Sequence, residues 1–212
     1  MKTTDLATDA AIEADAVVPR DFIWITARNR TTGIPVSYGM WSDRGTINAP
    51  VIDPVTKATV YRDWEGAGGL ISVQDVQMTT GLSVNTVSII LSQIDPLAEQ
   101  IIRGLDPRRG RVELYRGWLN PVSMLLTAPA IAEFVGFIDG APIITPAEGG
   151  EGRILLNCAS YTQEFTRSNS SKRSDADQRR RDPNDAFFQH VTTVGDWEVN
   201  WGIPNPPPEP ET

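Results

Sequence analysis

The chain has 212 residues and a formal net charge of −8 at neutral pH. That length suits one large domain, or one domain with appended arms. The acidic balance disfavours general DNA binding, because like charges repel at long range, but it suits a protein past which DNA moves without being held. Since Cys158 is the only cysteine and His190 the only histidine, an intrachain disulfide, a cysteine-rich zinc site and an iron–sulfur cluster within one chain are excluded.

Both ends of the chain differ in composition from its middle. Residues 1–19 are rich in Ala, Thr and Asp and contain no aromatic residue, which predicts an acidic arm that is mobile alone and orders against a partner. Residues 203–212 contain five prolines, which predict an extended, polyproline-like tail. No apolar run predicts a transmembrane helix, and the acidic start does not match a signal peptide. The chain is therefore expected to fold where it is made.

The first predicted elements form a hairpin. Residues 20–28 and 34–42 are aromatic and β-branched, and the Asn- and Gly-containing segment 29–33 between them is a turn signal. Along the first strand, Phe22 and Trp24 share one face while Ile23 and Ile25 share the other. Because both faces are apolar, we expect both to be covered.

The middle of the chain continues with strands and one helix. Asp95 and Pro96 predict the start of a helix over residues 95–103, and Gly104 its end. A second helical zone is predicted over residues 174–191, split near Pro183. Further strands are predicted over residues 58–64, 69–76, 82–92, 111–119, 130–139 and 152–161, with Cys158 buried on the last of these. The fold class is therefore mainly β, an antiparallel β-barrel or sandwich over residues 20–202 with one short mid-chain helix and a C-terminal helical segment.

No catalytic, metal or cofactor site is predicted. A serine triad needs a histidine base, and His190 follows two phenylalanines in a segment where a packing role is favoured. The sequence has no Gly-x-Ser-x-Gly elbow, Walker loop, dinucleotide fingerprint or His-Glu-x-x-His motif. One alternative is a small hydrolase that acts on glycans, because such enzymes use a pair of carboxylates. The candidate acids are Glu133, Asp139, Glu148 and Glu151. The chain is therefore expected not to be an enzyme.

Tryptophan and arginine carry the remaining functional signals. Tryptophans in a β protein favour a core or an interface, although exposed indoles stack on sugars and leave a carbohydrate- or receptor-binding virion module as the alternative function. The tryptophans are Trp24, Trp41, Trp64, Trp118, Trp197 and Trp201. Residues 167–182 form the densest charged segment, for which a subunit interface is favoured over a nucleic-acid patch, because carboxylates are interspersed and aromatics are lacking. A solvated surface is the third interpretation. The predicted interface comprises Arg167, Lys172, Arg173, Asp177, Arg179, Arg180, Arg181, Phe187, Phe188, Trp197 and Trp201.

Two stretches resemble a known family. The first runs from residue 71 to 121 and combines a strand pair, a short helix and the strand phrase Val-Glu-Leu-Tyr at residues 112–115. The second runs from residue 134 to 179, and the phrase Gly-Asp-Trp-Glu-Val-Asn-Trp-Gly follows at residues 195–202. Together they resemble the tail-tip or baseplate hub proteins of long-tailed bacteriophages and the related hub proteins of gene transfer agents.

The resemblance implies a β-barrel related to the tail-tube fold and a purely structural role in the virion. Such a subunit would form a ring at the tail tip, link the tail tube or distal tail protein to the central spike or fibre, and line the path of DNA ejection without specific binding. A homo-oligomer follows, with a trimer favoured and a hexamer as the alternative. The chain is shorter than larger hubs, which puts direct receptor binding in doubt.

Overall fold

The computed structural model describes residues 6–14, 16–77, 83–148, 150, 152–166, 168, 171–197 and 202. The chain divides into two compact units, Met1–Thr166 and Arg167–Thr212. All buried hydrophobic residues of the described chain lie in the first unit. The division into arm, domain and tail at residues 19 and 202 stays a prediction, whereas the contacts place a unit boundary after Thr166.

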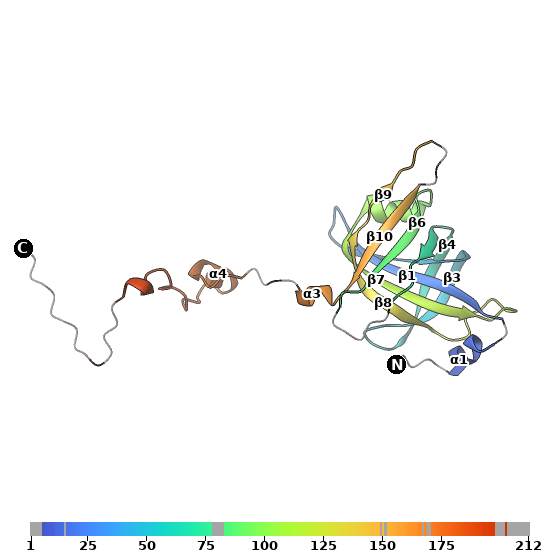
Figure 1. The fold of residues 1–212 in the computed structure, drawn as a ribbon, viewed down its shortest axis with the longest axis horizontal. Coiled ribbons are helices and arrows are strands. Elements are labelled where there is room, and N and C mark those ends of the chain that lie inside the picture. The colour runs from blue at the N-terminus through green and yellow to red at the C-terminus, as the bar shows by residue number, and fades with distance from the viewer. Residues whose placement is uncertain are drawn as a thin grey trace, which may run out of the picture. The chain divides into compact units, whose positions relative to one another are not determined.

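The first unit is built on a single mixed sheet, which confirms the mainly β fold class (Figure 1). Its strands follow the order β3-β4-β2-β1-β7-β8-β10-β6-β5, and β9 pairs with β10 off this path. The strands are β1 (Val18–Asn29), β2 (Pro35–Trp41), β3 (Arg44–Ile52), β4 (Thr59–Ala67), β5 (Leu70–Val73), β6 (Thr86–Ser92), β7 (Leu105–Leu119), β8 (Ala130–Gly140), β9 (Ile143–Ile144) and β10 (Arg153–Ser160). Strands β3 and β9 were not predicted. Gly45, Asn48 and Pro50 are typical of loops and hid β3, and β9 has only two residues.

Six of these strands close into a ring. Strand β3 pairs with β8 as well as with β4, so the order β3-β4-β2-β1-β7-β8 returns to its start. Two of the seams are short: β2 meets β4 at the single pair Met40–Glu65, and β3 meets β8 only at Val51–Ala130 and Ile52–Ile131. Interactions between side chains inside the ring must therefore supply much of the closure.

The predicted hairpin is confirmed as β1 and β2, with Phe22 opposite Trp41. The Asn29 side chain accepts hydrogen bonds from the backbone amides of Thr31 and Thr32 at 2.9 and 3.0 Å. Gly33 has a φ of 71°, a left-handed conformation that glycine adopts without strain. The turn chemistry therefore fixes the register that sends alternate β1 residues to opposite faces.

Both faces of β1 are covered, as predicted, and they contribute to two separate cores. Phe22 packs inside the six-strand ring with aromatic partners from each neighbouring segment, including Trp41, Trp64 and Tyr115. Ile23 and Ile25 pack on the opposite face with residues of β6, β8 and β10. Cys158 belongs to this second core and is buried, as expected.

The mid-chain helix is also confirmed and closes the second core. It comprises α2 (Pro96–Glu99) and the π-helical η1 (Gln100–Gly104). Asp95 caps its start by accepting a hydrogen bond from the Ala98 amide at 2.9 Å, and Gly104 is its last residue. Ile101 and Ile102 are buried from this helix, so the predicted apolar face does pack on the sheet.

Near the N-terminus, the structure contains a helix that was not predicted. Residues of the predicted arm form α1 (Leu6–Ile12), which contacts β7 and buries Thr8. Alanine is the best helix former, so the Ala-rich composition that suggested an arm also favours this helix. Strand β1 then begins at Val18, inside the same predicted arm.

The C-terminal helical zone is shorter than predicted. Helix α4 (Asp175–Arg181) begins after a Ser174 cap, but the expected second helix after Pro183 is wrong. Residues 183–193 form successive turns, followed by η2 (Val194–Asp196). Asp182 and Asp185 explain the difference, because their side chains accept hydrogen bonds from the Asn184 and Phe187 amides at 3.0 and 2.9 Å and so compete with a helical ladder. The short helix α3 (Gln163–Thr166) ends the first unit.

Candidate functional site

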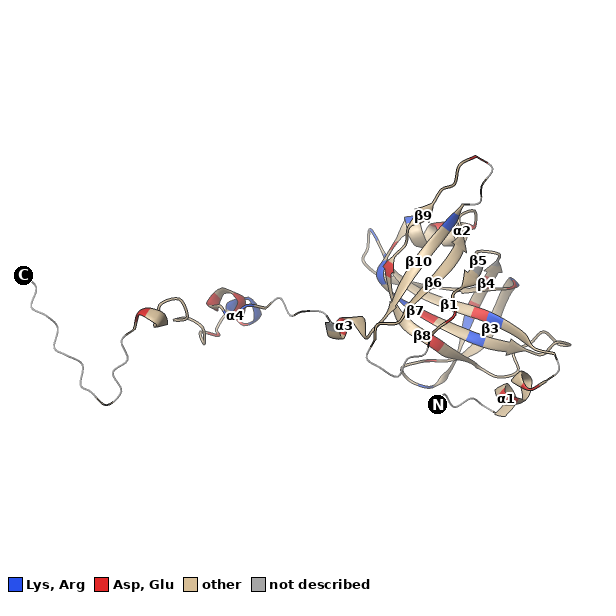
Figure 2. Cartoon of the chain, in the orientation of Figure 1, with Lys and Arg blue, Asp and Glu red and all other residues tan. Residues whose placement is uncertain are grey.

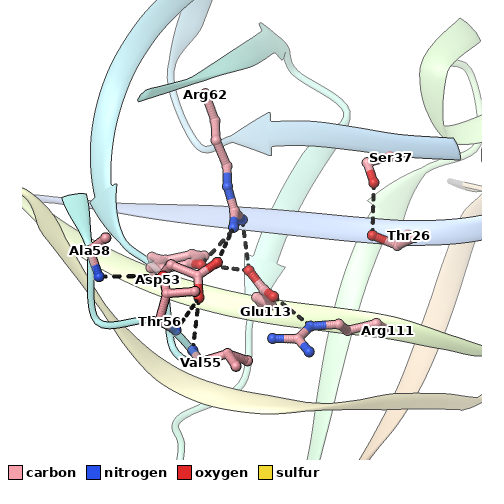
Figure 3. A network of polar contacts seen from close by, with 10 residues as sticks. Thr26, Ser37, Asp53, Val55, Thr56, Ala58, Arg62, Arg111 and Glu113 are labelled. Atoms are coloured by element: carbon pink, nitrogen blue, oxygen red, sulfur yellow. Dashed lines mark hydrogen bonds and ion pairs between the residues drawn. The ribbon is translucent and has the colours of Figure 1, made fainter. Parts of the chain in front are cut away.

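A polar network occupies the interior of the six-strand ring. Glu113 and Tyr115 alternate along β7 and therefore face the same side, opposite the position of Trp24 on β1. Arg62 reaches the same point from β4, and Asp53 from the turn that follows β3 (Figure 3). The network thus links β7 to the paired strands β3 and β4, neither of which is a neighbour of β7 in the sheet.

Glu113 is the centre of the network. Its Oε2 accepts hydrogen bonds from Arg62 Nη1 at 2.7 Å and from the Tyr115 hydroxyl at 2.5 Å. Its Oε1 accepts from Arg111 Nε at 2.5 Å. Arg62 also donates to Asp53 Oδ2 at 3.2 Å. The Glu113 side chain is 4% exposed and that of Arg62 is 11% exposed, so water cannot replace these partners.

Electrostatics hold this carboxylate in its charged form. Burial alone would raise the pKa of Glu113, but hydrogen bonds from Tyr115 and Arg62 outweigh it and leave that pKa below its ordinary value. Burial and the hydrogen bond to Glu113 both raise the pKa of Tyr115. At neutral pH the pair is therefore a carboxylate and a neutral phenol.

The Arg62 guanidinium is further fixed by aromatic rings. It lies 4.6 Å from the centre of the Trp24 ring and 5.7 Å from that of Tyr115. Trp24 and Tyr115 in turn contact Trp64 edge-on. A guanidinium stacked and hydrogen-bonded on all sides contributes rigidity. Both Glu113 oxygens accept hydrogen bonds, so the network links β7 to β4 and, through Arg62, to Asp53.

The carboxylates considered for a hydrolase do not form a pair in the described chain. Glu133 lies near Arg116, with 3.7 Å between its Oε2 and Nε, while Asp139 and Glu148 are exposed. Glu151 lies outside the described residues. His190 is exposed, and its ring contacts that of Trp197 at a centroid distance of 5.1 Å and an interplanar angle of 47°. Within the described residues, no group of His, Cys, Asp and Glu could hold a metal ion.

Three of the six tryptophans, Trp24, Trp41 and Trp64, pack in the core inside the six-strand ring. Trp64 is fully buried and Trp41 nearly so, while Trp24 and Trp118 are half-buried. Trp197 is 51% exposed and lies in the second unit. Trp201 lies outside the described residues.

The arginine-rich segment forms ion pairs within its own helix. Arg179 Nε lies 2.8 Å from Asp175, and Arg181 Nη2 lies 3.1 Å from Asp177, both at a spacing of four residues. Figure 2 shows basic and acidic residues side by side on α4. Exposed pairs of this kind contribute about 0.3–0.5 kcal/mol each, so they hold the helix together without anchoring it to a core.

Other predicted interface residues lie on the surface of the second unit. Lys172, Arg173 and Arg180 are exposed. Phe187 is 80% exposed and makes an edge-on contact with Phe188, with ring centroids 5.0 Å apart. Arg167 falls outside the described residues, so its predicted role has no structural counterpart. The interface assignment as a whole stays a prediction.

Sequence reasoning did not identify the Glu113 network. The sequence feature that could have indicated it is Val-Glu-Leu-Tyr at residues 112–115, in which a carboxylate interrupts an apolar strand. In the structure all four of these residues are buried. A charge at such a position requires a paired partner, but the partner Arg62 is 51 residues away and could not be found from spacing.

Comparisons with known proteins give little further identification. No family model matches the sequence, and no curated protein matches it. Among solved structures, one similar chain belongs to "Virion of native gene transfer agent (GTA) particle", with a TM-score of 0.48 and 12% identity. The alignment covers 81% of this chain, which spans about half the length of the other. In the part of the chain described, no helix is long and apolar enough to cross a membrane.

Proposed function

We propose that the chain is a structural subunit of a phage tail tip, a hub or baseplate ring that links the tail tube or distal tail protein to a central spike or fibre. In this role the β unit forms the ring wall beside the DNA exit path, and copies of the chain assemble in the host cytoplasm before the virion is complete. The family resemblance over residues 70–202 motivates the proposal.

The observation that carries the proposal is the absence of any buried residue in residues 171–197. This segment contains α4, a succession of turns and η2, yet Phe187 and Trp197 remain largely exposed. Exposed aromatic side chains on a segment without a core are typical of a surface that becomes buried in an assembly. Lys172, Arg173 and Arg180 would then contact carboxylates of a neighbouring subunit.

The interior of the β unit supports a mechanical role. Its carboxylate network links β7 to β4 and to the turn after β3, and the two faces of β1 contribute to separate hydrophobic cores. Such cross-links between strands support a wall of fixed shape, which a ring subunit needs. An acidic chain also repels DNA and would let it pass without holding it.

Labelling of intact particles tests the proposal. Particles from the organism that makes the protein would be incubated with a polyclonal antibody raised against the full chain and imaged by electron microscopy. We expect label at one end of the tail. Label on the capsid, or a protein present in the cell but lacking from particles, would contradict a tail-tip subunit.

A further inference from the structure

A bulge in β7 presents arginines at one end of the β1–β7 pair. Thr26 pairs with Arg111, but Arg28 pairs with Asp106, so four residues of β7 stand opposite Ala27 alone. Bulges of this kind redirect side chains and are typical of functional positions. The extra residues are Pro107, Arg108, Arg109 and Gly110.

The bulge is held in an uncommon backbone conformation. Arg109 has a φ of 57°, which a non-glycine residue adopts at a cost. A Cβ atom on Gly110 would lie 2.7 Å from the Thr26 carbonyl oxygen, so only glycine fits there. Arg109 pairs with Glu164 and lies 5.4 Å from the centre of the Phe137 ring. These contacts fix the bulge and direct Arg108 outward.

A cavity of about 460 Å³ lies between the bulge and β1. Four arginines line it: Arg28, Arg108, Arg109 and Arg111. Arg109 and Arg111 are paired with Glu164 and Glu113. The exposed side chains of Arg28 and Arg108 form no hydrogen bond or ion pair with any described residue. Two guanidinium groups, one from β1 and one from the β7 bulge, are therefore available in the lining of the cavity.

The charge of the cavity distinguishes between two kinds of anionic partner. Asp106 is the one acid among the residues that line the cavity, and Glu113, which pairs with Arg111, is shared with Arg62, so the lining carries an excess of positive charge. Proteins that hold DNA typically make about 6–10 phosphate contacts, and two unpaired arginines on an acidic protein fall far short of that. One carboxylate bridging the two guanidinium groups matches the excess, because such groups bind carboxylates through paired hydrogen bonds.

We propose that this arginine cavity binds a carboxylate side chain of a second copy of the chain. The acidic excess of the protein supplies the complementary charge, since 27 Asp and Glu residues face 19 Lys and Arg residues. In a ring, each copy would present the arginine cavity to one neighbour and the carboxylate to the other. This inference rests on the proposed function insofar as that function requires several copies in one assembly.

Self-association of the full chain tests the inference. Sedimentation equilibrium would compare the wild type with Arg28→Ala/Arg108→Ala and with the control Arg44→Ala/Arg153→Ala, which removes the same charge from two exposed arginines elsewhere. We expect the first pair to raise the dissociation constant at least about tenfold and the control to leave it unchanged. Circular dichroism checks that both variants fold. Sodium phosphate should dissociate the wild type more than sodium chloride at equal ionic strength, and this difference should vanish in Arg28→Ala/Arg108→Ala.

Three results would overturn the inference. The two double variants could associate equally, the wild type could remain monomeric at every concentration, or phosphate could bind an unassociated wild type with no effect on copy number. None of these results bears on where antibody labels a particle, so the tail-tip proposal stands or fails separately.

Discussion

Glu113 is the residue around which the interior of the six-strand ring is organised. Changing Glu113 to Gln removes one of the two carboxylates that pair with Arg62, whose side chain is 11% exposed, and leaves Asp53 at 3.2 Å as the other. Leaving a buried charge with no partner costs about 3–5 kcal/mol, and Asp53 retains part of that stabilisation. We therefore expect the free energy of unfolding, measured by urea denaturation, to fall by up to that amount.

The same substitution at Glu164 is the matched control. Glu164 pairs with Arg109, but its side chain is 39% exposed and that of Arg109 is 57% exposed. Exposed pairs contribute about 0–1 kcal/mol, so Glu164→Gln should change the free energy of unfolding little. Equal effects of the two substitutions would show that burial of the Glu113 pair has no energetic consequence.

The lowered pKa of Glu113 makes its contribution depend on pH. A carboxyl group whose pKa is lower in the folded chain stabilises that chain fully above its unfolded pKa, and the contribution is lost as the pH falls through the folded value. The difference in unfolding free energy between wild type and Glu113→Gln should therefore be greatest near pH 7 and shrink below about pH 4.5. Urea denaturation at pH 7, 5 and 3 measures it. A difference that grew on acidification would mean that the pKa is raised.

Among the elements, the helix α2–η1 depends on one cap. Asp95 accepts the Ala98 amide at 2.9 Å and is itself buried. Asp95→Ala should lower the free energy of unfolding by about 0.5–2 kcal/mol, since the amide loses its acceptor. Asp95→Asn keeps an acceptor oxygen of the same reach and should remain close to wild type in urea denaturation. A full loss in Asp95→Asn would assign the effect to charge and not to capping.

Local signals in the sequence were sufficient for elements whose chemistry is local. The β1–β2 hairpin followed from alternation and from the Asn29–Gly33 turn, and the mid-chain helix followed from Asp95 and Pro96. Strand β3 was missed because its residues are poor strand formers that pair only in the context of β4 and β8. The ring closure depends on that strand, so a closed ring could not be predicted in detail.

Functional residues were harder to predict than elements, for a related physical reason. The Glu113 network joins Arg62, Asp53 and Tyr115 across three segments, and no spacing rule connects them. The arginine cavity depends on a register shift of β7 against β1, which periodicity does not reveal. By contrast, composition alone identified the charged segment of α4 but not that its arginines pair within the helix.

At the scale of the whole molecule, the two units differ in what stabilises them. Every member of both hydrophobic cores lies before residue 166, whereas no residue of 171–197 is buried. A chain ending at Thr166 should therefore keep the wild-type free energy of unfolding to within about 0.5 kcal/mol, because surface segments contribute little. Urea denaturation followed by tryptophan fluorescence measures it, since the core indoles are retained.

The same truncation separates folding from assembly. If residues 167–212 act by contacting other subunits, the chain ending at Thr166 should fold yet fail to enter particles. A control chain ending at Gly202 lacks only the proline-rich tail. Because it retains the charged and aromatic segment that the proposal requires, it should still enter particles. Immunoblots of purified particles from cells that supply each version compare their incorporation. Incorporation of both versions would assign assembly to the β unit alone, because its arginine cavity and its edges would then be sufficient contacts. Failure of both would move the requirement to residues 203–212.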